Sequence, residues 1–187
     1  MKKEQILVAV IALVAGLLLG ILFFGGKKDS APVGGGVPMG GGAPADYQQR
    51  IAEVEKIVAR EPGNIQAWVQ LGNDYFDTGQ TQKSINAYGK ALELDPNNTN
   101  VLTDQGVMFR KMGWFDKAIA NFEKAQKLDP KHLQSLYNLG VVYAQDLKQP
   151  AKATEIWERY LKMDSTSPTA QQIKGMMEQF KSPSSGR

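Results

Sequence analysis

The residue types that catalysis uses most often are scarce in this chain. It has one histidine, His132, and no cysteine among its 187 residues. Without thiols it cannot build a disulfide, a thiolate zinc site, an iron–sulfur cluster or a cysteine nucleophile. It also lacks a G-x-S-x-G motif, a D-x-D-x-D-G loop and an E-x-x-H pair. We therefore expect no enzyme activity, catalytic residue, metal site or cofactor. Because His132 lies in a turn after Pro130, we expect it to be a surface residue.

Charge and aromatic content do not indicate nucleic-acid binding. The formal net charge is +3, and the first 45 residues carry four lysines against one glutamate and one aspartate, so the remainder is close to neutral. A clustered basic patch is the usual footprint of nucleic-acid binding. Trp114, between two predicted helices, would offer a single ring and not a stacking platform for bases. Nucleic acid is therefore not an expected partner.

A period of 34 residues organises the centre of the chain, because Pro62, Pro96 and Pro130 follow one another at that interval. Proline disfavours the helical conformation in the residue before it, so each Asp-Pro pair ends a helix. Between the prolines, large, small and aromatic residues recur in register at helical spacings. The aligned positions are Trp68, Leu71, Gly72, Tyr75, Ser84, Tyr88 and Ala91; Leu102, Gln105, Gly106, Phe109, Ala118, Phe122 and Ala125; and Leu136, Leu139, Gly140, Tyr143, Ala153, Trp157 and Tyr160.

This register resembles the tetratricopeptide repeat. The resemblance implies an all-α fold, a superhelical solenoid of three helix-turn-helix repeats at about 65–98, 99–132 and 133–167. Its glycines would let the second helix of each repeat approach the first. Gln105 stands where the family usually has leucine, which predicts a looser second hairpin. Apolar spacing adds a helix that begins with Asp46 as its cap and a closing helix at about 168–181, so the repeat domain is predicted at 46–181.

The amino-terminal residues predict a membrane anchor. Residues 6–24 contain no charged or polar side chain. A helix of this length rises about 28 Å, close to the roughly 30 Å hydrocarbon core. A cleaved signal peptide would have a shorter apolar region, so we predict a transmembrane anchor at 1–24. Gly16 and Gly20 have the spacing that permits weak self-association. Residues 25–45, rich in Gly and Pro, are predicted to be a flexible linker, and 182–187 a disordered tail.

Lysines lie on both sides of this apolar segment, at Lys2-Lys3 and Lys27-Lys28. Cytoplasmic flanks carry an excess of Lys and Arg, and the α-amino group adds one charge to the first side. We therefore expect the amino terminus inside and the repeats outside, which corresponds to a single-pass protein of the bacterial inner membrane with a periplasmic repeat domain. A cytoplasmic repeat domain is the alternative.

In the family, the first helix of each repeat lines a concave face that binds peptides. The resemblance therefore implies a protein or peptide partner in this groove, where Arg110 and Lys111 would meet a carboxylate between the aromatic Phe76 and Tyr137. The alternative is that these side chains form an ordinary solvated surface. The predicted groove residues are Gln66, Val69, Asn73, Phe76, Asp77, Asn100, Thr103, Val107, Arg110, Lys111, Gln134, Tyr137, Val141 and Gln145, with Ala144 beside them.

Family members that hold the acidic tail of chaperones use lysines and asparagines around a carboxylate. Here Asn73 is kept, but the other clamp positions hold Val69, Asp104, Gln134 and Asn138, so that function is not expected. The architecture is similar to the repeat domain of c-type cytochrome biogenesis factors. It implies a membrane-tethered scaffold in envelope protein assembly or c-type cytochrome maturation. The alternatives are a structural subunit of a membrane complex and a cytoplasm-facing scaffold.

Overall fold

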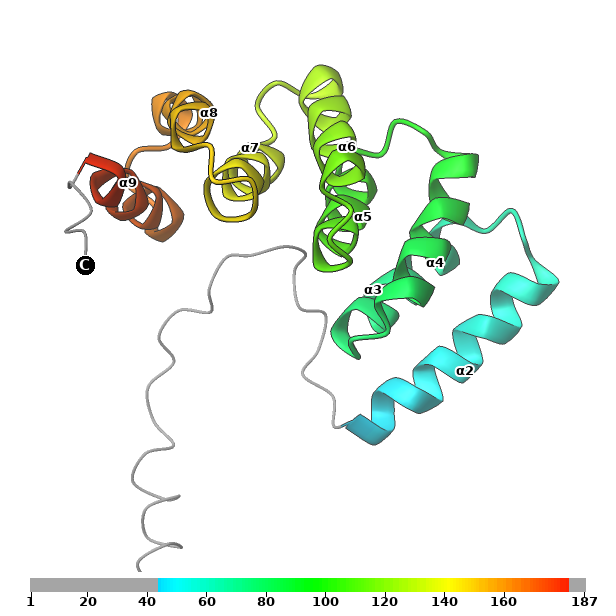
Figure 1. Cartoon of the computed structure of the whole chain (residues 1–187). Coiled ribbons are helices and arrows are strands. Elements are labelled where there is room, and N and C mark those ends of the chain that lie inside the picture. The colour runs from blue at the N-terminus through cyan, green and yellow to red at the C-terminus, as the bar shows by residue number, and fades with distance from the viewer. Residues whose placement is uncertain (1–43, 182–187) are drawn as a thin grey trace, which may run out of the picture. The chain divides into compact units, whose positions relative to one another are not determined.

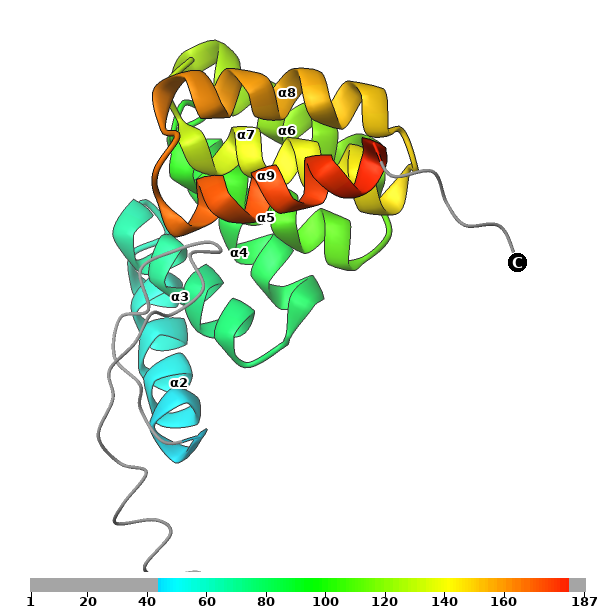
Figure 2. The same cartoon turned by 90° about the vertical axis from the view of Figure 1, so that its left-hand side faces the viewer.

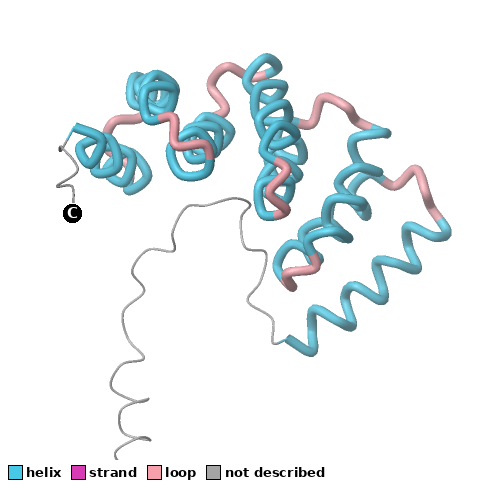
Figure 3. Tube along the Cα trace, viewed as in Figure 1, coloured by secondary structure: helices cyan, strands magenta, loops and turns pink. Residues whose placement is uncertain are grey.

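The computed structural model of this protein describes residues 44–181. Every regular element in this range is helical and none is a strand, as Figures 1 and 3 show. The predicted all-helical array is therefore confirmed for these residues. The elements are α2 (Pro44–Arg60), α3 (Ile65–Asp77), α4 (Thr81–Leu94), α5 (Thr99–Lys111), α6 (Phe115–Leu128), α7 (Leu133–Val141), the π-helical turn η1 (Val142–Asp146), α8 (Pro150–Met163) and α9 (Pro168–Lys181).

The helices form three hairpins, α3–α4, α5–α6 and α7–α8, between the flanking helices α2 and α9. We call α3, α5 and α7 the A helices, and α4, α6 and α8 the B helices. Each helix packs against the next one along the chain. The axes of α7, α8 and α9 run in nearly the same direction in Figure 2, whereas Figure 1 shows them end-on and α2 across the view. The direction of the hairpins therefore turns along the array.

Several predictions concern residues outside the described range. They are the transmembrane anchor at 1–24, the Gly16 and Gly20 pair, nearly all of the linker at 25–45, and the tail at 182–187. Within residues 44–181, no helix combines the length and the apolar character that crossing a membrane requires. Helix α2 begins at Pro44, so the prediction that Asp46 caps it is wrong, because Asp46 lies inside its first turn.

A glycine of each A helix lies against an aromatic ring of its B helix. A Cβ atom added at Gly72 or Gly106 would come to within 3.0 Å of the ring of Tyr88 or Phe122. Gly140 lies equally close to Trp157. Real Cβ atoms do not make contacts this short, so any side chain at these glycines would push the two helices apart. The glycine of each repeat thus allows the close approach of the two helices in its own hairpin.

Two core positions differ from the expectation. Trp157, in the register of the third repeat, is fully buried. Trp68, in the register of the first, is only half-buried, and the indole N–H of Trp68 donates to the carbonyl of Pro62 at 2.9 Å. The looser hairpin predicted from Gln105 is also wrong. The buried Gln105 amide donates to the carbonyl of Ile85 at 3.1 Å and accepts from Asn121 at 2.9 Å. Because its polar atoms are satisfied, this side chain joins the two neighbouring repeats.

Each A helix begins with a side-chain cap, at three equivalent positions of the repeat. The side chains of Asn64 and Asn98 accept backbone N–H groups at the starts of α3 and α5. At the third position His132 caps α7, and its Nδ1 accepts the N–H of Ser135 at 3.3 Å. Its Nε2 lies 2.9 Å from Oδ1 of Asn100 in the preceding repeat and donates to it in this tautomer. His132 is half-buried, so the expectation of an ordinary surface histidine is wrong.

The third hairpin absorbs its one extra residue in the turn between its helices. The first two turns each use a glycine with positive φ, Gly79 at 72° and Gly113 at 74°. In the third, α7 continues into η1, whose wider turn accommodates an additional residue. The positive φ of 54° then falls on Lys148, which is not a glycine. The third repeat therefore keeps the hairpin geometry without the glycine that the other two use.

The histidine cap predicts a pH-dependent stability. Burial lowers the pKa of His132 below its ordinary value, although the nearby Asp129 carboxylate acts in the opposite direction. The neutral ring is therefore favoured in the folded chain. The stability that it contributes is complete above a pH of about 6.5 and is lost as the pH falls through the lowered pKa, since a protonated Nδ1 can no longer accept from Ser135. His132→Asn should lose less stability than the natural chain between pH 8 and pH 5.

Urea unfolding at the two pH values measures this difference. The matched variant is Asn98→His, which places the same ring at the preceding junction and should increase the loss on acidification. If His132→Asn and the natural chain lose the same free energy of unfolding, the cap does not control the acid sensitivity of this junction.

Candidate functional site: the exposed face of the A helices

The predicted groove residues come from α3, α5, α7 and η1, and the structure brings these elements together. Contacts between side chains of successive A helices connect the first repeat to the second and the second to the third. We use the name A-helix face for the predicted groove residues that keep exposed surface. They are Gln66, Val69, Asn73, Phe76, Asp77, Asn100, Val107, Arg110, Lys111, Gln134, Tyr137 and Gln145.

The prediction that Thr103 and Val141 line the groove is wrong, because both side chains are buried. Thr103 is fully buried, and its hydroxyl donates to the carbonyl of Thr99 at 2.8 Å. Val141 is only 4% exposed and belongs to the hydrophobic core of the third repeat. Ala144, which was placed beside them, is also buried in that core. These side chains are buried, so they cannot contact a partner on this surface.

The carboxylate-binding role predicted for Arg110 does not fit its surroundings. The guanidinium already forms an ion pair with Asp146 of η1, at 2.5 Å between Nε and Oδ2. It also donates to Oε1 of Gln145 at 3.2 Å. Arg110 therefore joins the second repeat to the third. An incoming carboxylate would have to compete with Asp146 and Gln145 for the guanidinium.

Lys111, the second cation predicted to meet a carboxylate, is also engaged within the chain. Its Nζ lies 4.5 Å from the centre of the Phe76 ring, a distance at which a cation is attracted to the negative face of the ring. Lys111 is nevertheless exposed. It joins α5 to α3 and leaves part of its charge open to solvent.

The apolar members of the A-helix face are half-buried and help to pack the repeats. Val69, Phe76 and Val107 pack against the core of the first two repeats, and Val107 and Tyr137 against the core of the third. These residues therefore belong in part to the packing between repeats. Each of them still exposes part of its side chain. They form an apolar strip flanked by Asn and Gln side chains, which suits contact with a polypeptide.

Asp104, which departs from the chaperone clamp, also differs from the other carboxylates of the A helices in its surroundings. It is half-buried and shares one stripe of α5 with Asn100, Val107 and Lys111. Burial raises the pKa of its carboxyl group to about 7, and a hydrogen bond from Gln134 lowers it only in part. A burial effect of this size could not be read from the sequence, because it depends on how closely α4 and α7 pack against α5.

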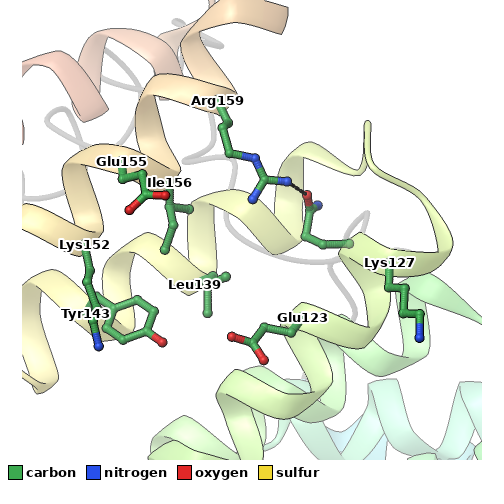
Figure 4. Close-up of a pocket in the computed structure, with 9 residues that line it drawn as sticks. Glu123, Lys127, Leu139, Tyr143, Lys152, Glu155, Ile156 and Arg159 are labelled. Atoms are coloured by element: carbon green, nitrogen blue, oxygen red, sulfur yellow. Dashed lines mark hydrogen bonds between the residues drawn. The ribbon is translucent and has the colours of Figure 1, made fainter.

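Two hollows lie away from the A-helix face. One, of about 650 Å³, borders the turn between α5 and α6 at Trp114, which is 37% exposed. The other, of about 470 Å³, opens between α6 and α8. Figure 4 shows acidic and basic side chains of both helices around an apolar floor; the lining residues are Glu123, Gln126, Lys127, Leu139, Tyr143, Lys152, Glu155, Ile156 and Arg159. Opposite charges are mixed there, and no nucleophile is paired with a base.

A metal site would need several ligating side chains close together. In residues 44–181, no group of three or more histidine or carboxylate side chains is placed to hold a metal ion. The only histidine has both ring nitrogens engaged, with Ser135 and Asn100.

Family comparison decides the class of the protein. Models described as tetratricopeptide repeat or TPR repeat match residues 65–98, 87–120, 106–146 and 134–167. The chain belongs to the tetratricopeptide repeat family. The first and last matches coincide, to within one residue, with the repeats predicted at 65–98 and 133–167. The match at 87–120 instead joins α4 to α5 and the start of α6.

Solved structures of repeat proteins share this fold. MamA is similar over 73% of this chain and 80% of its own, at 23% identity and a TM-score of 0.67. A tetratricopeptide repeat protein of Parabacteroides merdae is similar over 73% of this chain and 54% of its own, with 21% sequence identity and a TM-score of 0.66. The first TPR domain of Spaghetti (RPAP3) was solved with the HSP90 peptide SRMEEVD. It is similar over 63% of this chain and 94% of its own, with 20% sequence identity and a TM-score of 0.58. No curated protein is similar enough in sequence to count as a relative.

The raised pKa of Asp104 predicts how this tetratricopeptide repeat protein responds to Asp104→Asn. Because the folded chain holds the carboxyl proton up to a pH of about 7, ionisation costs stability as the pH rises through that value. The variant, which cannot ionise, should melt at a higher temperature than the natural chain at pH 8. The difference should shrink towards pH 5.

Thermal unfolding at the two pH values tests this expectation. Asp116→Asn removes the same charge from an exposed position of α6 and serves as the control. A stability difference for Asp104→Asn that does not change with pH would contradict the assigned burial of its carboxylate.

Proposed function

We propose that this protein is a scaffold that binds an extended segment of another polypeptide on its A-helix face. The observation that carries the proposal is the strip of Val69, Phe76, Val107 and Tyr137, whose half-exposed side chains run across three consecutive A helices. Asn and Gln side chains beside it can pair with the backbone of a bound peptide. The same face is the one by which the family binds peptides, and the Spaghetti repeat domain was solved with a peptide.

We further propose that the scaffold is tethered to the bacterial inner membrane by residues 6–24, with its repeats in the periplasm. The apolar sequence of this segment and the Gly/Pro-rich residues that follow it support the tether. The partners would be envelope proteins during assembly, or apocytochromes during c-type cytochrome maturation. A structural subunit with one permanent partner is the competing function, and a cytoplasm-facing scaffold is the competing topology.

The partner can be found by photo-cross-linking from a defined position on the full chain. A photoreactive side chain replaces Gln66 on the A-helix face and, in the control, Lys124 on α6. Both positions are exposed. The polypeptide that cross-links from position 66 is then purified for binding measurements. Cross-links that form only from position 124 would place the partner on a different surface.

A substitution on the A-helix face should weaken binding of that purified partner. Val107→Arg places a long charged side chain in the apolar strip, so the affinity should fall about tenfold or more, near 1.4 kcal/mol. Ala120→Arg adds the same side chain on exposed α6 and should change the affinity little. Both variants should keep their helical circular dichroism. Equal affinities for the two variants would remove the A-helix face from the proposed function.

The nature of the cross-linked polypeptides separates the pathways. Several proteins with haem-attachment (C-x-x-C-H) motifs would support cytochrome maturation. One envelope protein in fixed stoichiometry would support a structural subunit.

The topology predicts where a fused reporter is active. A reporter that works only outside the cytoplasm, joined after Lys181, should be active with the full chain, because the apolar segment would export the repeats. Fusing the same reporter to a chain that lacks residues 1–24 should abolish the activity. An active cytoplasmic reporter on the full chain would contradict the periplasmic placement and favour the cytoplasm-facing scaffold.

A further inference from the structure

Beside the A-helix face, on α5, lies a carboxylate, that of Asp104, with no cationic partner among the described residues. Asp104 lies on α5 in a stripe with Asn100, Val107 and Lys111. At the equivalent positions of the first and third repeats, the chain has the neutral residues Gln70 and Asn138. The charge is therefore a feature of the central repeat and not of the repeat pattern.

One oxygen of this carboxylate is available to a ligand. Oδ1 accepts a single long hydrogen bond from Gln134, at 3.4 Å. In residues 44–181, every fully buried side-chain nitrogen or oxygen has a hydrogen-bond partner. Because no partner of Oδ2 is found within these residues, this atom must reach the surface. The residue as a whole is half-buried, so the carboxylate lies partly inside the array with Oδ2 open to solvent.

The cations nearest along α5 do not serve Asp104. Arg110 is paired with Asp146, and Lys111 lies over the Phe76 ring. The ion pairs found among residues 44–181 all use other carboxylates. Towards α3, the neighbouring side chain is Tyr88, whose hydroxyl donates to Asn73 at 2.7 Å. Burial, and secondarily the charge of Asp104, raises the pKa of Tyr88, which therefore stays a neutral phenol.

We propose that the polypeptide bound on the A-helix face presents a lysine or arginine side chain to Asp104. This inference rests on the proposed function, because it names the chemistry of the partner at the same face. A bound peptide would remove the remaining water from the open oxygen, and a carboxylate without water or a counter-ion is strongly destabilised. A cationic side chain restores the balance, whereas an acidic peptide adds repulsion. The preference is thus opposite to that of an acidic chaperone tail.

Selection from a displayed library of random short peptides tests the preference directly. The purified full chain, Asp104→Asn and Asp104→Lys are immobilised, and each is used for selection under the same conditions near pH 8, where the carboxylate is ionised. Asp116→Asn is the matched control for loss of one acidic charge. Peptides enriched by the natural chain and by Asp116→Asn should share a Lys or Arg at one position. That requirement should disappear with Asp104→Asn and should change to Asp or Glu with Asp104→Lys.

Affinities of one enriched peptide and its Lys→Gln counterpart give the size of the effect. With the natural chain the exchange should weaken binding about tenfold. With Asp104→Asn, most of that difference should vanish, as a double-mutant cycle requires for two groups in contact. Circular dichroism of each variant confirms that it is folded.

The outcomes separate this inference from the function on which it rests. Enriched peptides that need no cation, or a cation preference that survives Asp104→Asn, would overturn the role of Asp104 and leave peptide binding intact. Enriched peptides whose affinity is unchanged by Val107→Arg would overturn both, because they would bind elsewhere. The same holds if no peptide is enriched.

Discussion

The contact between a glycine of each A helix and an aromatic ring of its B helix is the constraint on which the rest of the structure depends. Tyr88, Phe122 and Trp157 are almost completely buried at these contacts. Their rings occupy the space that a side chain at Gly72, Gly106 or Gly140 would need. This closeness brings the buried small residues of each hairpin, such as Ala91, Ala118 and Ala153, into the core. It also fixes which side of each A helix is left to form the A-helix face, so the geometry of recognition follows from the packing of the hairpins.

Charges on the A helices have two separate uses. Arg50 with Asp74, and Arg110 with Asp146, join neighbouring elements through ion pairs that are partly shielded from water. Shielded pairs of this kind hold their geometry better than fully exposed ones. Asp104 has no such partner among the described residues, although it is enclosed to a similar degree. A repeat protein is stabilised mainly by contacts between neighbouring repeats, and the contact of Asp104 across such a junction is one long hydrogen bond from Gln134, at 3.4 Å.

Departures from the repeat pattern show where the array is adjusted locally. Gln105 replaces an apolar residue and uses its amide to connect Ile85 and Asn121. His132 replaces the asparagine cap and reaches Asn100 across the junction. The third turn replaces a glycine by a π-helical turn followed by Lys148. His132 keeps the helix cap that asparagine provides at the other two junctions. Gln105 adds hydrogen bonds that an apolar side chain could not make, and the third turn takes in one more residue than the other two.

For residues 44–181, the sequence alone determined the fold class and the number of α-helices. It could do so because a helix needs only local signals: apolar residues at spacings of three and four, a glycine at the close contact, and an Asp-Pro pair at the end. The residues offered for the groove were also chosen by helical spacing. That reasoning placed most of them on exposed surface, but it could not find that Thr103 and Val141 are covered by neighbouring helices.

Only the tertiary structure decided which charges are already paired. Arg110 and Asp146 are 36 residues apart, and Lys111 and Phe76 are 35 apart. Whether such side chains meet depends on how far one hairpin is rotated against the next, and small differences in helix packing set that rotation. The burial of Asp104 between its neighbours arises in the same way. Local sequence patterns therefore specify the helices and their order. Which charged side chains of the A helices are paired depends instead on the contacts between repeats.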